Sequence, residues 1–350
     1  MGFDRIRASR PLQLTAVVLL GVALTVSVLV WHGLRVLDQQ VLAPDQGRAL
    51  MVRRGDSLHR ILTTLEDEGL LENARLLGWI ARMHQIDSQV KAGEYRLHAG
   101  LSARDLLMLL VSGQVVQYRV TIPEGLTLRE ALGILHQQPE ITPLLSLDNP
   151  LEIAELVGQS EWPEGWFLPE TYAFTRGDSD RSLLLRAHAE LTDLLQALWR
   201  DRNPDLPLAS PFEALILASI IEKETAVASE RAQIAGVFIR RLQRGMRLQT
   251  DPTVIYGLGP QFDGNLTRRH LQDNSNPYNT YRIAGLPPTP IALPGRAALE
   301  AVFMPDNSET LYFVARGDGT HEFSETLAEH EQNVRQYQRV RRQDYRSTPL

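Results

Sequence analysis

An uncharged apolar run near the N-terminus limits most strongly what this chain can form. Arg10 and Arg35 bracket LQLTAVVLLGVALTVSVLVWHGL, which contains no Asp, Glu, Lys or Arg. A helix of roughly 20 apolar residues crosses the hydrocarbon core of a bilayer. The apolar region of a secretory signal peptide is shorter, roughly 7–15 residues, and ends in small residues for cleavage. This run is longer and ends in Trp31, which favours the membrane interface, so we predict a retained single-pass anchor.

The residues around this run predict an orientation, and the composition excludes several protein classes. Arg5, Arg7 and Arg10 precede the run, so the N-terminus should stay in the cytoplasm and everything after Arg35 should lie beyond the membrane. The 350 residues suffice for two domains of ordinary size. A net charge of −6 gives no basic field for nucleic acid. The absence of cysteine excludes disulfides, thiolate zinc sites and cysteine nucleophiles.

A repeated local pattern follows the anchor. After a polar linker, an extended segment, Gly-x-Ser/Thr and an apolar helix occur three times, as MVRRGDSLHRILTTL, YRLHAGLSARDLLMLL and YRVTIPEGLTLREALGIL. Ser57, Ser102 and Thr127 stand where an N-cap belongs. We therefore predict small strand–helix units with antiparallel pairing over residues 49–136. Further on, helices are expected at 182–200, 212–225, 230–244 and near the C-terminus, and the Pro/Gly/Asn-rich stretch 251–295 should form turns.

Two matches to serine-enzyme motifs have simpler explanations. GDSL at 55–58 is the nucleophile motif of one esterase class, and DGTH at 318–321 offers Asp318 and His321 as partners. Ser57, however, occupies the same slot as Ser102 and Thr127, and an N-cap explains all three. SQVK at 88–91 matches Ser-x-x-Lys without a Lys-Thr-Gly partner. The nine histidines show no metal-ligand spacing, so we expect no metal ion and no cofactor.

The stretch ASIIEKETAVASE, residues 218–230, is the strongest candidate for chemistry. Ser210, Pro211 and Glu213 mark a helix start by a capping box with proline at the first position. The following residues are apolar on every face, which predicts a buried helix. Glu222 then ends the run, too far from the N-terminus for the helix dipole to hold it ionised. Burial raises a carboxyl pKa, and a proton held near neutral pH is what a general acid needs.

A structural interpretation of the same stretch stays open. Glu222 could end the apolar run at the surface and pair with Lys223 or Arg231. Glu224 points to a different face of the helix and is, from the sequence, the better candidate for a structural ion pair.

Two later stretches are rich in side chains that bind sugars. MRLQTDPTVIYGLG (246–259) and NPYNTYRIAGLPPTPI (276–291) are dense in Gln, Thr, Asp, Asn and Tyr. Turn chemistry explains their prolines and glycines but not their polar and aromatic residues. We predict that these positions bind substrate, together with Glu170: Gln249, Thr250, Asp251, Tyr256, Asn279 and Tyr281.

These motifs together resemble one family. ASIIEKETAVASE, RLQTDPTVIYGLG, NPYNTYRIAGLPPTPI and EGWFLPETYAF (164–174), with HEFSETLAEHEQNV near the C-terminus, are similar to the YceG-like (MltG) family of endolytic murein transglycosylases. The similarity runs from the anchor to about residue 340. It implies a bacterial inner-membrane protein with periplasmic domains, peptidoglycan glycan strands as substrate and association with penicillin-binding peptidoglycan synthases. It also implies that Glu222, the first Glu of EKET, is the catalytic residue.

The resulting prediction is an α+β protein. We expect a cytoplasmic stub and transmembrane anchor at 1–36, a linker at 37–48, a small LysM-like domain at 49–115 and a larger mixed catalytic domain at 116–345. The expected reaction cuts the MurNAc–GlcNAc bond inside a strand with 1,6-anhydroMurNAc formation, Glu222 acting first as acid and then as base. Two alternatives remain at this stage: a non-catalytic wall-binding scaffold, and a membrane-anchored serine hydrolase built on Ser57.

Overall fold

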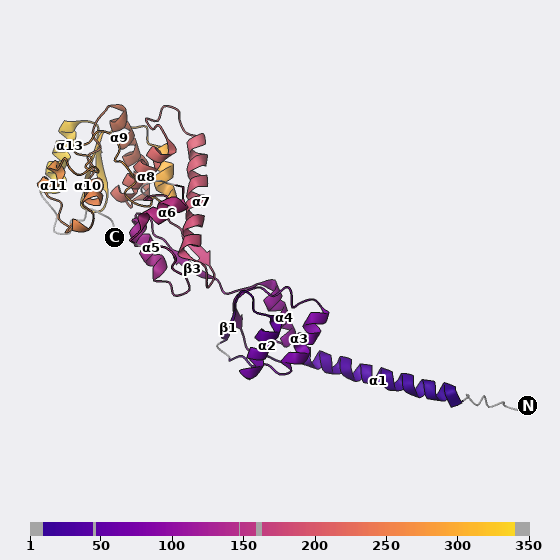
Figure 1. Cartoon of the computed structure of the whole chain (residues 1–350). Coiled ribbons are helices and arrows are strands. Elements are labelled where there is room, and N and C mark those ends of the chain that lie inside the picture. Colours follow the sequence, from indigo (N-terminus) through magenta and orange to yellow (C-terminus); the bar gives the residue numbers. More distant parts are fainter. Residues whose placement is uncertain (1–9, 45–46, 147, 159–162, 340–350) are drawn as a thin grey trace, which may run out of the picture. The chain divides into compact units, whose positions relative to one another are not determined.

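The computed structural model describes residues 10–44, 47–146, 148–158 and 163–339. The chain forms two compact units (Figure 1). Unit 1 comprises residues 1–118 and 175–177, and unit 2 comprises residues 119–174 and 178–350. The long apolar helix near the N-terminus therefore belongs to the same unit as the small domain that follows it.

Unit 1 contains a two-stranded antiparallel sheet, three short helices and the long apolar helix near the N-terminus. The register of its sheet runs from Arg48 opposite Leu97 to Val52 opposite Gly93. Its elements are α1 (Arg10–Asp38), β1 (Arg48–Val52), α2 (Leu58–Asp67), α3 (Ala74–Met83), β2 (Gly93–Leu97) and α4 (Ala103–Ser112). The predicted helix starts are confirmed, because Ser57 and Ser102 accept hydrogen bonds from the backbone N–H groups of Arg60 and Asp105.

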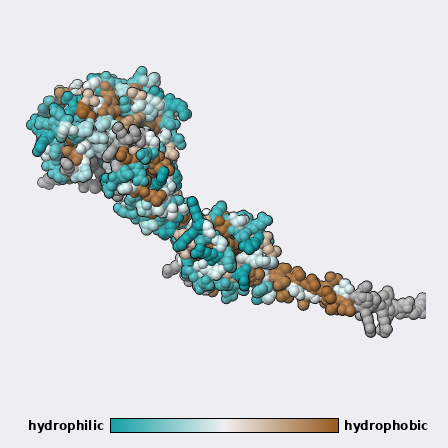
Figure 2. All heavy atoms as spheres, viewed as in Figure 1, coloured by the Kyte–Doolittle hydropathy of each residue, from teal (hydrophilic) through white to brown (hydrophobic). Residues whose placement is uncertain are grey.

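Helix α1 combines a long apolar stretch with a C-terminal end that packs into unit 1. The stretch Leu14–Asp38 of this helix is long enough and apolar enough to cross a membrane. Figure 2 shows its surface as mainly hydrophobic. Its last turns, in contrast, join the core of unit 1, where Val36 is buried. Val41, inside the segment predicted as a linker, is also buried, and its N–H donates to the carbonyl of Leu101. The segment after α1 is therefore packed against the domain.

Unit 2 is mainly helical, with two small sheets. Strand β3 pairs with β4, and β5 pairs antiparallel with β6 from Tyr312 opposite Ser324 to Ala315 opposite His321. Its strands are β3 (Tyr118–Thr121), whose first residue belongs to unit 1, β4 (Thr171–Phe174), β5 (Tyr312–Ala315) and β6 (His321–Ser324). Its helices are α5 (Leu128–His136), α6 (Pro150–Leu156), α7 (Asp180–Arg200), α8 (Pro211–Glu224), α9 (Arg231–Gln243), α10 (Asp251–Leu258), α11 (Arg268–Gln272), α12 (Arg296–Phe303) and α13 (Leu327–Val334).

Helix α8 is the central element of unit 2. It packs against α7, α9 and α12, and every residue from Ala214 to Ile221 is buried. The prediction of a helix buried on all sides is thus confirmed. Its start differs slightly from a capping box: the Ser210 hydroxyl accepts the N–H of Glu213, but the Glu213 carboxylate accepts the N–H of Ala209. Burying such a helix is favourable because each large aliphatic side chain removed from water contributes about 1.5–3 kcal/mol.

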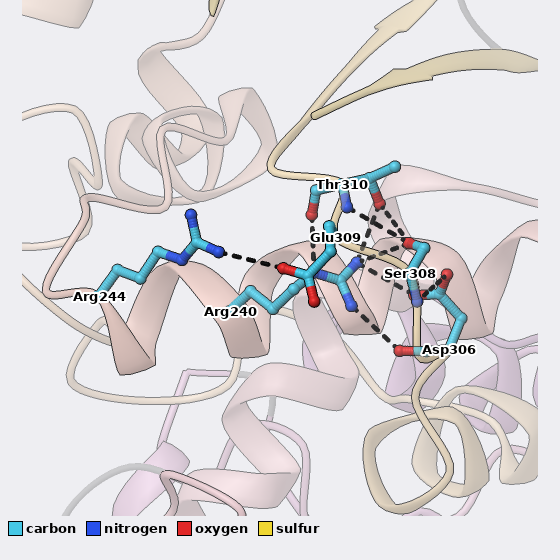
Figure 3. Close-up of polar contacts among 6 residues, drawn as sticks. All are labelled: Arg240, Arg244, Asp306, Ser308, Glu309 and Thr310. Atoms are coloured by element: carbon cyan, nitrogen blue, oxygen red, sulfur yellow. Dashed lines mark hydrogen bonds and ion pairs between the residues drawn. The ribbon is translucent and has the colours of Figure 1, made fainter. Parts of the chain in front are cut away.

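Two adjacent arginines near the end of α9 fix the chain on either side of that helix. Arg240 reaches the loop before β5 (Figure 3), where it donates to the carbonyls of Asp306 and Thr310 and to side-chain oxygens of both residues. Arg241 is buried and donates to the carbonyls of Leu248 and Leu311. A guanidinium has five N–H groups, so one side chain satisfies several buried carbonyls at once. These contacts hold the start of the β5–β6 hairpin and the segment before α10 beside α9.

Candidate active site

A cavity of about 1540 Å³ lies in unit 2 at the C-terminal end of α8. Its wall is built by the first turn of α5, the last turn of α8, helix α10 with the residue before it, the Tyr278–Tyr281 segment and the β5–β6 hairpin. Several of these elements are distant in sequence, so only the folded chain assembles this wall. Cavities of this size accommodate ligands larger than a single sugar ring.

The last turn of α8, with the residue after it, anchors four other segments through four successive residues. Glu222, Lys223, Glu224 and Thr225 each make a hydrogen bond to a different part of the chain. Their respective partners are the N–H of Gly295, the carbonyl of Gly125, the hydroxyl of Thr250 and the carboxylate of Glu230. The charged run at the end of the apolar helix is therefore where α8 meets its surroundings.

Glu222 occupies a charged cluster. Its Oε2 accepts the N–H of Gly295, at the start of α12, at 3.0 Å, and its Oε1 lies 3.6 Å from a guanidinium nitrogen of Arg231. Arg231 also lies 3.7 Å from Glu124. Burial raises the pKa of the Glu222 carboxyl and Glu124 raises it further, while Gly295 and Arg231 act in the opposite direction. Among the described residues, the cavity lining includes Lys223 and Glu224 but not Glu222.

Glu224 faces the cavity and has a different environment. The hydroxyl of Thr250 donates to its carboxylate. Burial raises the pKa of Glu224 to about 7 and the nearby Asp251 carboxylate contributes, whereas Thr250 and Arg241 act in the opposite direction. In the described chain, no ion pair within 4 Å includes Glu224. The sequence-based assignment of a structural ion pair to Glu224 was therefore wrong: the pair forms at Glu222, because tertiary packing places Arg231 beside that residue.

The two polar stretches predicted to bind substrate lie side by side. The N–H of Gln249 donates to the carbonyl of Thr280, and the N–H of Thr250 to the Thr280 hydroxyl. Gln249 adopts a φ of 52°, the left-handed region that is rare for residues with a side chain. This pairing brings most of the predicted residues to one wall. The cavity lining includes Gln249, Thr250, Asp251, Tyr256 and Tyr281.

Asn279 and Glu170 lie elsewhere. Asn279 is fully buried, and its amide donates to the carbonyls of His270, Leu271 and Asp273. Glu170 is exposed, and its backbone carbonyl accepts the N–H of Ile122. In the described chain neither residue is part of the cavity lining. Asn279 shapes the loop that carries Tyr281, because its side-chain oxygen accepts the N–H of that tyrosine.

Glu164 is a cavity residue that the sequence did not single out. It is 4% exposed, accepts the N–H of Leu128 at 2.8 Å and accepts the hydroxyl of Tyr256 at 3.1 Å. Burial raises the pKa of Glu164 to about 7. Tyr256 in turn meets Tyr278 edge to face, with 5.0 Å between ring centroids. The available signal was the acid that opens the aromatic stretch EGWFLPETYAF.

The residues of the serine-hydrolase alternative have other partners. Ser57 caps α2. Asp318 accepts hydrogen bonds from the N–H and the hydroxyl of Thr320. His321 lines the cavity, but its Nδ1 lies 2.8 Å from Glu230. Within the described residues, His, Asp and Glu side chains form no group of three or more suited to a metal ion.

Comparison with known proteins defines the family. The family model of the YceG-like family matches residues 50–336, and the chain belongs to this family. An endolytic murein transglycosylase of Bacillus subtilis is 28% identical over 303 residues, covering 81% of this chain and 82% of that protein. An endolytic murein transglycosylase of Streptococcus pneumoniae is 28% identical over 324 residues, covering 82% of this chain but 57% of that longer protein.

A solved structure supports the same relationship. The crystal structure of a yceG-like protein from Listeria monocytogenes aligns with a TM-score of 0.54 at 31% sequence identity. The alignment covers 83% of this chain and 99% of the Listeria chain.

Proposed function

We propose that this protein is an endolytic lytic transglycosylase that cleaves the MurNAc–GlcNAc bond of peptidoglycan glycan strands and forms 1,6-anhydroMurNAc ends. The observation that carries the proposal is the position of the Glu224 carboxyl at the wall of a large cavity. Burial raises the pKa of this carboxyl to about 7. A carboxylic acid protonated near neutral pH is the proton donor that glycoside cleavage requires. The names of the relatives from Bacillus and Streptococcus point to the same substrate class.

The reaction needs one carboxyl group that acts twice. Protonated Glu224 donates to the glycosidic oxygen, which leaves with the GlcNAc unit as the bond to MurNAc C1 breaks. The resulting carboxylate then takes the proton of the C6 hydroxyl, and O6 of the same MurNAc closes on C1. Effective molarities for well-oriented intramolecular attack reach on the order of 10⁵ M or more. One carboxyl therefore suffices where ordinary glycosidases use two.

The geometry favours Glu224 over Glu222, the residue to which the sequence motif assigned this role. Glu222 is held by Gly295 and Arg231, and an adjacent guanidinium favours the ionised form of a carboxyl. Glu224 meets the cavity and accepts its bond from the neutral hydroxyl of Thr250. A donor must reach the substrate oxygen, and in the described chain only Glu224 of the two lines the cavity.

The cavity wall supplies groups that suit a sugar chain. Tyr281 donates to Asp251 at 2.6 Å, which fixes its hydroxyl at the residue that follows Thr250, the partner of Glu224. Tyr256 is oriented by Glu164. Aromatic faces pack on the apolar side of pyranose rings, and amide, hydroxyl and carboxylate groups bond their hydroxyl and acetamido groups. We assign substrate positioning to Tyr256, Tyr281 and Gln249 on this basis.

The cellular setting is also part of the proposal. Helix α1 would anchor the protein in the bacterial inner membrane, with the N-terminus in the cytoplasm and both units in the periplasm. There the protein would meet newly made glycan strands and shorten them during synthesis. A LysM-like, glycan-binding role for residues 49–115 and association with penicillin-binding synthases rest on the family resemblance alone.

The products released from isolated sacculi test the chemistry. The full chain in detergent is incubated with sacculi, and the released fragments are treated with borohydride and analysed by mass spectrometry. Ring closure by O6 gives 1,6-anhydroMurNAc ends, which borohydride does not reduce. Attack by water gives reducing ends, which borohydride does reduce, and this outcome would make the protein a hydrolase. If a control muramidase releases glycan fragments from the same sacculi and the native protein releases none, the result would favour the alternative of a non-catalytic wall-binding scaffold.

A further inference from the structure

The end of α1 packs into the core of unit 1. Val36 is buried in the core of that unit, and Asp38 lies 3.4 Å from Arg104 of α4. Further into the apolar run, a Cβ added at Gly33 would meet the Cδ1 atom of Ile80, on α3, at 3.8 Å. Figure 1 shows α3 beside the domain end of α1. Helix α3 therefore touches α1 within the apolar run itself.

The exposed face of α3 is unusual for a small domain. Trp79 and Met83 are 62% and 64% exposed, although both are large and apolar. They stand four residues apart, so they share one face of the helix. Each is also close in sequence to Ile80, the residue that meets α1. Isolated exposed apolar side chains are ordinary on protein surfaces. Here, however, two of them lie close to the contact between α3 and α1. The apolar side chains of α1 are themselves exposed as far along the helix as Leu34.

Basic residues complete this face. Arg75 and Arg82 are exposed on the same helix, and Arg82 lies 3.4 Å from Asp87. On α1, Arg35 stacks over Trp31 at 4.4 Å near the end of the apolar run. Trp and Arg are characteristic of the membrane interface, where an aromatic ring has an apolar body and a polar edge and a guanidinium meets anionic headgroups. Helices that lie in the interface combine such apolar residues with basic ones.

We propose that the face of α3 formed by Arg75, Trp79, Arg82 and Met83 lies in the headgroup region of the bilayer that α1 crosses. The partner is an anionic lipid surface, and the argument is continuity: Ile80 of α3 lies beside α1 at Gly33, within the apolar run. Unit 1 would then be seated on the membrane surface and held there by both α1 and α3. This proposal rests on the membrane anchoring proposed above for α1 and is independent of the reaction proposed for unit 2.

Single-cysteine labelling tests the proposal directly, because the chain contains no cysteine. Trp79→Cys and Met83→Cys are made in the full chain, spin-labelled and reconstituted in vesicles containing phosphatidylglycerol. Oxygen, which concentrates in lipid, and a water-soluble nickel complex are then compared as relaxing agents by electron paramagnetic resonance. Leu24→Cys, inside the apolar run, is the lipid reference, and Asp67→Cys, on the exposed polar side of α2, is the water reference.

The proposal predicts an oxygen-to-nickel accessibility ratio at positions 79 and 83 several-fold above that at position 67. Ratios at both positions equal to that at position 67, with a high ratio at position 24, would leave the anchor in place and overturn the α3 contact. A low ratio at position 24 would remove the anchor and the proposal together. Circular dichroism of each labelled variant shows that it is folded, and two substituted positions guard against a local effect of one label.

Discussion

Two carboxyl groups two residues apart on α8 have opposite environments. Glu222 pairs with Arg231 and accepts a backbone N–H, whereas Glu224 faces the cavity beside Thr250. At 3.6 residues per turn their side chains point about 160° apart around the helix axis. The comparison teaches that burial alone does not identify a catalytic acid, since burial raises the pKa of both residues. The difference is that Glu222 has an arginine partner, whereas Glu224 has access to the cavity.

The largest expected effect is on catalysis at Glu224. Glu224→Gln keeps the size of the side chain and its hydrogen bond to Thr250 but cannot cycle a proton. We expect release of glycan fragments from sacculi to fall by about 10²–10⁴-fold, the range typical of general acid–base catalysis. Circular dichroism should show a native fold.

Glu222→Gln is the matched control and should affect stability more than turnover. Gln still accepts the N–H of Gly295 but leaves Arg231 with Glu124 as its remaining carboxylate neighbour. Loss of one partner of a buried charge should cost about 1–3 kcal/mol, measured by urea unfolding followed by tryptophan fluorescence. Activity should stay within about tenfold of the native value. An inactive Glu222→Gln with an active Glu224→Gln would exchange the two roles.

The pH dependence of stability should distinguish native protein from Glu224→Gln. Because burial raises the pKa of Glu224 from 4.5 to about 7, the folded chain holds a proton that the unfolded chain releases above pH 4.5. This contribution is fully present below the unfolded pKa and is lost as pH rises through about 7. It amounts to at most about 3 kcal/mol. The free energy of unfolding of Glu224→Gln minus that of native protein should therefore be larger at pH 8 than at pH 5. An equal difference at both values would place the pKa of Glu224 near its ordinary value.

The smallest effect concerns unit 1. Ser57→Ala removes the N-cap of α2 and should cost about 1 kcal/mol of stability. Release from sacculi should be almost unchanged, because unit 2 contains the whole cavity. A folded but inactive Ser57→Ala would instead revive the serine-hydrolase alternative.

Local patterns in the sequence predicted local structure well. Caps at Ser57, Ser102 and Thr127 predicted three helix starts, and the all-round apolar run predicted the buried helix α8. Pairing between distant segments left no such signal. Strand β4 joins β3 across about fifty residues, and nothing in the short stretch TYAF indicates that partner. Register in such pairs depends on the tertiary fold.

The candidate site shows the same division. Helical spacing placed Glu222 and Glu224 on different faces, and that is correct. Which face meets the cavity depends on Arg231, Gly295 and Thr250, whose positions the sequence does not give. Glu164 was missed for the same reason, because its burial results from the approach of Leu128 and Tyr256 from distant segments.

The alkaline limb of the pH–rate profile tests most directly whether Glu224 supplies the proton. Activity on sacculi should fall as pH rises through about 7, because the acid form is lost. The hydroxyl of Thr250 lowers the pKa of Glu224, so Thr250→Val should move this limb to higher pH, while Glu222→Gln and Glu164→Gln should leave it in place. A limb that stays unchanged in Thr250→Val would contradict the assignment, and loss of activity in Glu222→Gln would return the catalytic role to Glu222.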